Sequence, residues 1–157
     1  MKRVLLPLLF SAVGFVALHA QELKIRANSF TSDQKKGISV FKGDVNIIKE
    51  HDELNASQLT VFTDKNNRPK KFVAVGDVSF RITTKDGSIY EGVANKSIYL
   101  PKKREYYFYK NVHLRELHDK KEILGDEVVL KTQDGKAYAK GLKKEPVIMI
   151  FDIDEEK

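Results

Sequence analysis

The chain has 157 residues, which is room for one domain of ordinary size. It contains no cysteine, so disulfide bridges, thiolate zinc sites, cysteine nucleophiles and lipid attachment through an N-terminal cysteine are excluded. Its net charge is +6, or +4 without Lys2 and Arg3 near the N-terminus, which is modest for this length and does not demand a nucleic-acid partner.

Residues 1–20 have the pattern of a secretory signal peptide. The basic pair Lys2-Arg3 is followed by the apolar run Val4–Leu18, and Ala20 is a small residue suited to signal-peptidase cleavage. The run is interrupted by Pro7 and is shorter than the roughly 20 residues that a membrane-spanning helix needs. We therefore expect export to the periplasm and removal of this segment.

The mature chain is then expected to be a single domain over residues 21–157. Leu18 lies three positions before the cleavage site and is larger than the alanine favoured there. The alternative is therefore that the segment is kept as a membrane anchor, and N-terminal sequencing of the secreted protein distinguishes the two.

The remaining sequence predicts short antiparallel strands separated by turns. Apolar and polar residues alternate, as on a strand with one buried face, at Val45-Asn46-Ile47, Leu59-Thr60-Val61, Val78–Ile82 and Val112-His113-Leu114. Turn-forming residues stand at Asp64–Pro69, Asp86-Gly87, Asp134-Gly135 and Gly141. Helical spacing is not sustained anywhere after the leader, and Asp119–Leu124 is expected to be a brief helical turn or a hairpin loop. The predicted fold class is all-β.

Two short signatures alternate along the chain. The first joins a small residue, two polar residues and the start of a strand, at Ala27-Asn28-Ser29-Phe30, Ala56-Ser57-Gln58-Leu59, Ala94-Asn95-Lys96-Ser97 and Gly125-Asp126-Glu127-Val128. The second consists of Gly43-Asp44-Val45, Gly76-Asp77-Val78 and a degraded copy, Lys110-Asn111-Val112. Glycine reaches conformations closed to other residues and aspartate bonds nearby amides, so the second signature predicts a bulge or bend.

The alternation of side chains also changes phase across the first signature. Leu54 and Ala56 share one face, whereas Leu59 and Val61 follow the other register, so a corner or bulge near Ser57 must absorb one residue. Bent hairpins of this kind do not bury their apolar faces singly. We expect them to fold over into two facing sheets, as a jelly roll or an elongated sandwich.

In these motifs the chain resembles the LptA/OstA-like family of lipopolysaccharide transport proteins, whose members alternate a G-[DN]-V element with an A-[DS]-x-[LVIM]-x-[YV] element. The resemblance covers about residues 23–142, with Lys110 in place of the glycine in the third unit. It implies an open, twisted antiparallel β-jelly roll built from repeated bent hairpins. It also implies a periplasmic protein that bridges the inner and outer membranes and holds lipid A acyl chains in an apolar groove, with no enzymatic activity, metal or cofactor.

The resemblance further implies protein partners. These are an LptC-like inner-membrane protein, an LptD-like outer-membrane protein and further copies of the chain, joined head to tail through sheet edges. The anchored LptC-like partner shares the fold and is the alternative function within the pathway. The last strand, expected in Pro146–Ile153, either adds to a neighbour's sheet or is an ordinary edge strand followed by acidic residues.

The expected lipid-binding face consists of the periodic apolar positions of the strands. They are Val45, Ile47, Leu59, Val61, Val78, Phe80, Ile82, Val112, Leu114, Val128 and Leu130. The alternative for any one of them is ordinary core. Basic clusters beside the turns are expected either to hold the phosphates of the ligand or to remain solvated. They are Lys35-Lys36, Lys70-Lys71, Lys102-Lys103-Arg104, Lys120-Lys121 and Lys143-Lys144.

A periplasmic hydrolase is the main hypothesis of a different class, and the sequence offers it no catalytic constellation. His113 and His118 flank Glu116, but their odd spacing on a strand places the two imidazoles on opposite faces. His51-Asp52-Glu53 is typical of a polar hairpin turn. The aromatic run Tyr106–Tyr109 suits base stacking, but export argues against a nucleic-acid partner.

Overall fold

The computed structural model describes residues 22–142, 144–153 and 155. The expected signal peptide, residues 1–20, lies outside this part of the chain. The described residues form the strands β1 (Leu23–Arg26), β2 (Ser29–Asp33), β3 (Ile38–Lys49), β4 (Asp52–Thr63), β5 (Pro69–Thr83), β6 (Ile89–Leu100), β7 (Glu105–Glu116), β8 (Lys121–Lys131), β9 (Lys136–Lys140) and β10 (Ile148–Ile150). None of these residues belongs to a helix, so this part of the chain has no helical segment able to cross a membrane. The all-β prediction is confirmed.

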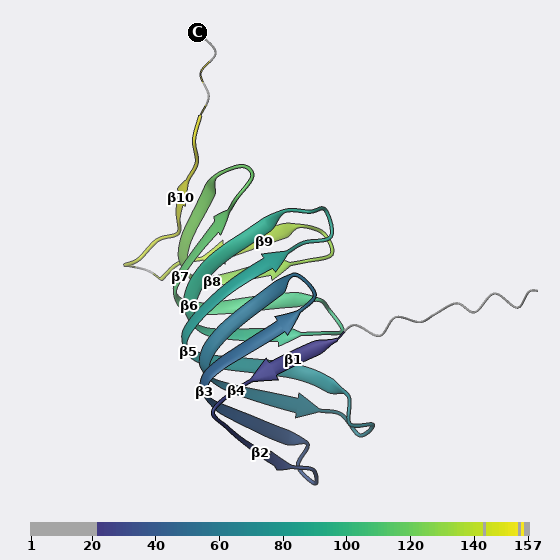
Figure 1. Ribbon diagram of the computed structural model, residues 1–157. Helices are drawn as coiled ribbons and strands as arrows, with labels where there is room; N and C mark the ends of the chain where they lie inside the picture. The colour runs from purple at the N-terminus through teal and green to yellow at the C-terminus, as the bar shows by residue number, and fades with distance from the viewer. Residues whose placement is uncertain (1–21, 143, 154, 156–157) are drawn as a thin grey trace, which may run out of the picture.

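The strands form one antiparallel sheet in the order β1-β3-β4-β5-β6-β7-β8-β10, with β2 added to β3 and β9 added to β8. From β3 to β8, each strand pairs with the next one along the chain. These long strands bend near their middles, so the sheet folds over on itself (Figure 1). Two short strands complete each end of the sheet, β1 and β2 on β3, and β9 and β10 on β8.

The bends of β3, β5 and β7 lie at the second signature. The pairing register shifts between Lys42 and Val45, between Val75 and Val78, and between Tyr109 and Val112. The two residues inside each shift have positive φ, namely Gly43 (81°) and Asp44 (44°), Gly76 (84°) and Asp77 (46°), and Lys110 (62°) and Asn111 (50°). The predicted bulges are thus confirmed in all three units, including the unit in which lysine replaces glycine.

The partner strands change side-chain phase at the first signature. In β4, Ala56 and Leu59 are buried and Ser57 between them is exposed. The register with β5 shifts between Asn55 and Gln58. The corner expected near Ser57 is confirmed, and it lies beside the bulge of the neighbouring strand.

The fold divides the sheet into two facing layers. Layer A consists of β1, β10, the C-terminal halves of β3, β5 and β7, and the N-terminal halves of β4, β6 and β8. Layer B consists of β2, β9 and the remaining half of each long strand. The inward side chains of both layers form one core. Phe80 of layer A stacks on Phe108 of layer B, with ring centroids 3.9 Å apart. The two facing sheets expected from the sequence are therefore one continuous sheet.

The outer face of layer A carries a row of alternating charges. Glu53, Arg81, Glu91, Arg115 and Glu122 are directly opposite one another on successive strands from β4 to β8. Glu91 forms ion pairs with both Arg81 and Arg115. Because opposite charges stabilise cross-strand pairs and like charges destabilise them, the row favours this register.

The hairpin loops lie along two rims, one for each layer. The rim of layer B, with the loops β2–β3, β4–β5 and β6–β7, carries the basic clusters Lys35-Lys36, Lys70-Lys71 and Lys102-Lys103-Arg104. The rim of layer A carries Lys120-Lys121 together with acidic residues such as Glu50 and Asp119. Lys143 of the last cluster lies outside the described residues. Positive charge is therefore concentrated on the rim of layer B.

Candidate ligand-binding cavity

A cavity of about 340 Å³ lies between the two layers, beneath β1 and the strands from β3 to β7. Its size falls in the range of roughly 300–1,000 Å³ that is typical of small-molecule sites. The lining is mostly apolar or aromatic and comes from both layers. It includes Leu23, Ile47, Leu54 and Ile82 of layer A, and Leu59, Pro69, Phe72, Ala74, Tyr99, Pro101 and Tyr106 on the side of layer B.

Small side chains in layer B leave this space open. Ala74 of β5 and Ser97 of β6 are direct cross-strand partners, and both line the cavity. In the same row, the next partner on β7 is Phe108, which is fully buried. Phe108 fills the interior at this point of the sheet. The small side chains of Ala74 and Ser97 do not reach as far, so the space in front of them stays open.

On the side of the cavity toward β8, side chains fill the interior and the rims of the two layers meet. Phe80 and Phe108 stack there, and Gly92 makes room for them, because a Cβ at this position would lie 2.7 Å from the Phe80 ring. The backbone N–H of Lys85, on the rim of layer A, donates a hydrogen bond of 2.8 Å to the carbonyl of Thr132, on the rim of layer B. The cavity is therefore closed on this side, and its mouth lies on the other side, among exposed lining residues such as Leu23, Pro69 and Arg104.

Polar and charged groups surround the mouth. Lys49 Nζ donates to the hydroxyl of Tyr99 at 3.2 Å and lies over the Tyr99 ring. The Tyr106 hydroxyl donates to Asp52 Oδ2 at 3.4 Å, and the Tyr99 and Tyr106 rings stack 4.3 Å apart. Arg104 also lines the cavity. The cavity thus has an apolar body and, around its mouth, two basic groups, Lys49 and Arg104, which suit an anionic head, together with the carboxyl groups of Asp52 and Glu53.

Burial shifts the pKa of two groups that line the cavity. Desolvation raises the pKa of Asp52, although the backbone N–H of Thr83 hydrogen-bonds its carboxylate and Lys49 lies nearby. Desolvation of the Tyr106 hydroxyl and the nearby charge of Asp52 also hold the pKa of Tyr106 well above its ordinary value. Asp52 therefore lies in an environment that disfavours its charged form.

The structure brings only some of the predicted lipid-binding residues to the cavity. Ile47, Leu59 and Ile82 line it. The other eight, Val45, Val61, Val78, Phe80, Val112, Leu114, Val128 and Leu130, are buried members of the core and do not line it. Their expected role in lipid binding stays a prediction.

Several lining residues were missed by the sequence analysis. Phe72 and Ala74 continue a period-two alternation in β5 that was followed only from Val78 onwards. Tyr106 was considered as a base-stacking residue or as ordinary core, and not as part of a binding cavity. Ser97 and Tyr99 were treated as parts of a repeat, and only the register shows that they face Ala74 and Phe72.

The histidines of the hydrolase hypothesis lie apart from the cavity. His113 is on the outer face of layer A, with Nε2 3.1 Å from Glu122 Oε2, and His118 is in the turn after β7, with Nδ1 3.3 Å from Glu116 Oε1. Within the ranges that the structure describes, no three His, Asp or Glu side chains gather closely enough to hold a metal ion.

The folded antiparallel sheet and its internal apolar cavity define the class of the molecule, an open β-jelly-roll protein. The sequence model of the family described as "LptA/(LptD N-terminal domain) LPS transport protein" matches residues 24–136, and the chain belongs to this family. The resemblance to LptA/OstA-like proteins is thereby confirmed. Family and fold are those of a lipopolysaccharide transport protein and not those of a known enzyme.

A solved structure shares the fold. The chain superposes with a TM-score of 0.75 on the crystal structure of LptH from Pseudomonas aeruginosa, described as the LptA homologous periplasmic component of the conserved lipopolysaccharide transport device. The two sequences are 18% identical, and the match covers 85% of this chain and 96% of LptH. No curated protein sequence matches the chain in the corresponding comparison.

Proposed function

We propose that the protein binds lipopolysaccharide in the periplasm and carries it between the inner and outer membranes, with lipid A acyl chains in the cavity between layers A and B. The observation that carries this proposal is the apolar cavity of about 340 Å³ in a member of a lipopolysaccharide transport family. Ile47, Leu59, Phe72 and Ile82 supply the apolar contacts. Burying acyl chains there is favourable because it removes apolar surface from water on both partners.

The basic groups are proposed to hold the phosphates of the ligand. Lys49 and Arg104 line the cavity, and Lys102 and Lys103 adjoin Arg104 on the rim of layer B. Arginine and lysine form charge-assisted hydrogen bonds with phosphate. A lipid with apolar chains inside and phosphates at the mouth matches this distribution of charge.

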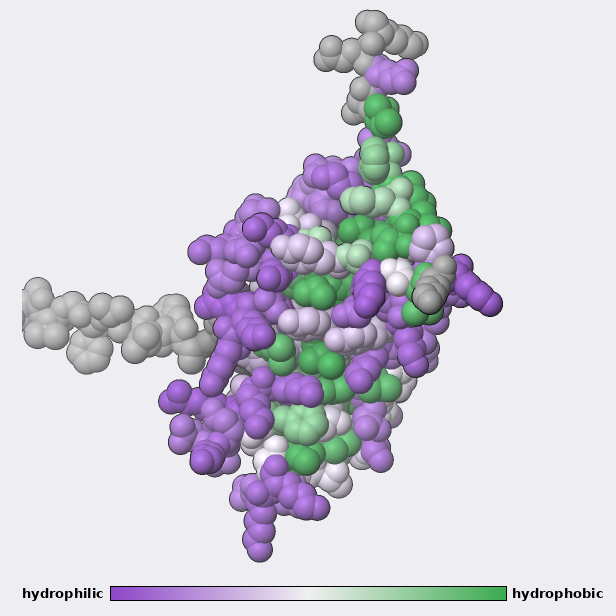
Figure 2. Space-filling view, turned by 180° about the vertical axis from the view of Figure 1, so that it is seen from behind, coloured by the Kyte–Doolittle hydropathy of each residue, from purple (hydrophilic) through white to green (hydrophobic). Residues whose placement is uncertain are grey.

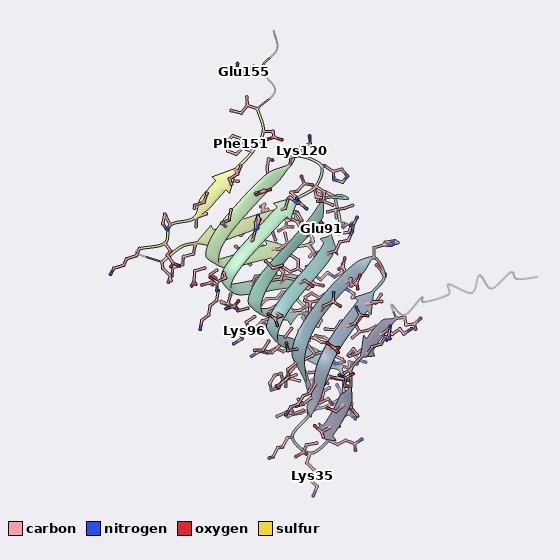
Figure 3. The ribbon with its side chains drawn as sticks, turned by 60° about the vertical axis from the view of Figure 1, so that its left-hand side comes forward. Lys35, Glu91, Lys96, Lys120, Phe151 and Glu155 are labelled. Atoms are coloured by element: carbon pink, nitrogen blue, oxygen red, sulfur yellow. The ribbon has the colours of Figure 1, made fainter. Side chains whose placement is uncertain are left out.

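The two ends of the sheet are proposed as the contacts of the bridge. At one end β2 is exposed along its whole length, and at the other end the three residues of β10 are exposed. Unpaired strand edges recruit further strands. Lys35 beside β2 and Phe151 beyond β10 lie at opposite ends of the molecule (Figure 3). Head-to-tail copies, an LptC-like protein and an LptD-like protein are the proposed neighbours.

Exposed apolar side chains support the C-terminal end as a contact. Ile148, Met149, Ile150 and Phe151 are each about half exposed. Figure 2 shows apolar side chains in a band between hydrophilic margins, and this apolar surface continues into the C-terminal segment. Exposed apolar surface of this kind marks protein–protein contacts in soluble proteins.

A photo-crosslinking experiment in cells tests the proposed lipid site. A benzophenone amino acid at Phe72, which is buried and lines the cavity, is expected to form lipopolysaccharide adducts on irradiation. The same amino acid at Arg81, on the outer face of layer A, is the matched control and is expected to form none. Adducts at Arg81 with none at Phe72 would contradict the proposal.

A further inference from the structure

Ser97 places a single hydrogen-bonding group deep in the apolar cavity. The side chain lines the cavity, and the residue is only 2% exposed. Among the described residues, no group is a hydrogen-bond partner of its Oγ, and this is the one buried side-chain polar atom there without a partner. Buried hydroxyls are normally hydrogen-bonded, because leaving one unpaired costs about 1–3 kcal/mol.

The position of Ser97 on β6 sets its depth. Tyr99, two residues nearer the rim, belongs to the polar mouth, and the bend of β6 begins just beyond Lys96. Two residues along a strand correspond to about 7 Å. The cross-strand neighbours of Ser97 are Ala74 and Phe108, neither of which has a side-chain hydrogen-bonding group. The Ser97 hydroxyl is therefore a polar point well below the charged groups of the mouth.

We infer that this site selects acyl chains that carry a hydroxyl group along the chain, with Ser97 Oγ as its hydrogen-bond partner. The inference rests on the proposed function and specifies its ligand. A plain alkyl chain fills the apolar space but leaves Ser97 unpaired, whereas a hydroxyl at the right depth both donates to Ser97 and accepts from it. Buried polar groups discriminate strongly against ligands that leave them unpaired.

The depth of Ser97 also specifies where the hydroxyl must lie. With the acidic head of the ligand at Lys49 or Arg104, a hydroxyl on the carbon next to the head stays at the mouth and does not reach Ser97. A hydroxyl farther along the chain does. Position, and not merely polarity, is therefore expected to decide affinity.

Binding of three acids to the purified mature protein tests the inference. The probes are tetradecanoic acid, the same acid hydroxylated in mid-chain, and the same acid hydroxylated next to its carboxyl group, each measured by displacement of a fluorescent fatty acid. We expect the mid-chain hydroxyl to raise affinity roughly tenfold over the plain acid, as one buried hydrogen bond does. The hydroxyl next to the carboxyl group is expected to give no gain.

The variant Ser97→Ala is expected to bind the plain and mid-chain-hydroxylated acids equally. Its melting temperature without ligand is expected to be equal to or higher than that of the wild type, because the substitution removes an unpaired polar group. Ser79→Ala, on the outer face of layer A, is the matched control and is expected to keep the tenfold preference.

The results separate two kinds of failure. If the acids bind but Ser97→Ala keeps the wild-type preference, or the wild type has none, the inference is overturned and the proposed function stands. A lower melting temperature for Ser97→Ala also overturns it, since the hydroxyl would then be satisfied without a ligand. If none of the acids binds and Phe72 forms no lipopolysaccharide adducts, the cavity is not a lipid site and both proposals fail.

Discussion

Asp52 is a titratable group that lines the cavity. Its carboxylate accepts hydrogen bonds from the Thr83 backbone and the Tyr106 hydroxyl, but burial still raises its pKa above the ordinary value of 3.8. The folded protein therefore holds this proton over a pH window in which the unfolded chain has already lost it. Asp52 consequently stabilises the fold most below pH 3.8 and loses that contribution as pH rises through the folded pKa.

The substitution Asp52→Asn is expected to remove this pH dependence. Asparagine keeps an acceptor for the Thr83 N–H but has no charge to desolvate. The wild type should lose stability relative to Asp52→Asn as pH rises above 3.8, and the difference should become constant above the folded pKa. Thermal unfolding of both proteins across a pH series measures it.

Asp64→Asn is a control for which the opposite dependence of stability on pH is expected. Hydrogen bonds from the Arg68 and Asn66 backbone lower the pKa of Asp64. The wild type should therefore gain stability relative to Asp64→Asn as pH rises. Parallel pH profiles for the wild type and Asp52→Asn would show that burial does not disfavour the Asp52 charge.

The sequence predicted the inward direction of individual residues better than it predicted what they contact. Leu59 and Ile82 were expected on the inner face from alternation alone, and both line the cavity. Phe80 was expected there for the same reason but packs against Phe108. Whether an inward residue lines a cavity or fills the core depends on the sizes of its cross-strand neighbours, such as Ala74 and Ser97, and these are fixed only by the register.

Among the structural elements, the bends of the long strands are the most informative. Gly43 and Gly76 have the left-handed conformations that glycine adopts at little cost. Lys110 has the same conformation with a φ of 62°, although an L-residue pays roughly 1–2 kcal/mol there. The third bend therefore keeps its geometry because the pairing of β7 with β6 and β8 requires it.

The substitution Lys110→Gly is expected to stabilise the protein by about 0.5–1 kcal/mol. It relieves the left-handed strain, and the greater freedom of glycine in the unfolded chain offsets part of the gain. The midpoint of urea unfolding measures the change.

Gly76→Ala is the reciprocal variant and is expected to destabilise. The new Cβ would lie 2.9 Å from Ser57 at a φ of 84°. If Lys110→Gly lowers the unfolding midpoint, conformational strain is not what distinguishes the third bend from the first two.

The sequence predicted these bends but not the extent of the last strand. The Gly-Asp pairs have a local conformational preference that can be recognised without tertiary information. The segment Pro146–Ile153 was expected to be a strand, and only Ile148–Ile150 pairs with β8. Pairing at an edge depends on how the chain returns to the sheet after the bridge between Leu142 and Glu145, and apolar character alone does not specify it.

At the scale of the whole molecule, the two exposed ends of the sheet predict directional association. Deleting residues 146–157 removes β10 and the exposed apolar residues beside it, the proposed C-terminal contact, and Phe30→Lys places a charge on the exposed N-terminal edge strand β2. Each variant alone is expected to be monomeric in analytical ultracentrifugation, under conditions in which the wild type forms a concentration-dependent series of oligomers. The physical reason is that each variant retains only one of the two proposed contacts.

A mixture of these two variants is expected to form one-to-one dimers and nothing larger, because one intact edge of each kind remains. Val93→Asn reduces exposed apolar surface on the outer face of layer A, away from both edges, and should associate like the wild type. Oligomers of unchanged size for the deletion variant would show that the C-terminal edge is not a contact.

Under the proposed function, the backbone hydrogen bond from Lys85 to Thr132 would affect how lipid moves along a row of such molecules. A lipid molecule that entered beside β1 and left toward β9 would meet this hydrogen bond and the stacked rings of Phe80 and Phe108 as a barrier. Under the proposed function, onward movement would then proceed in discrete hops, each of which requires this barrier to open, and not by continuous sliding. Each copy would hold a lipid molecule for a residence time of its own.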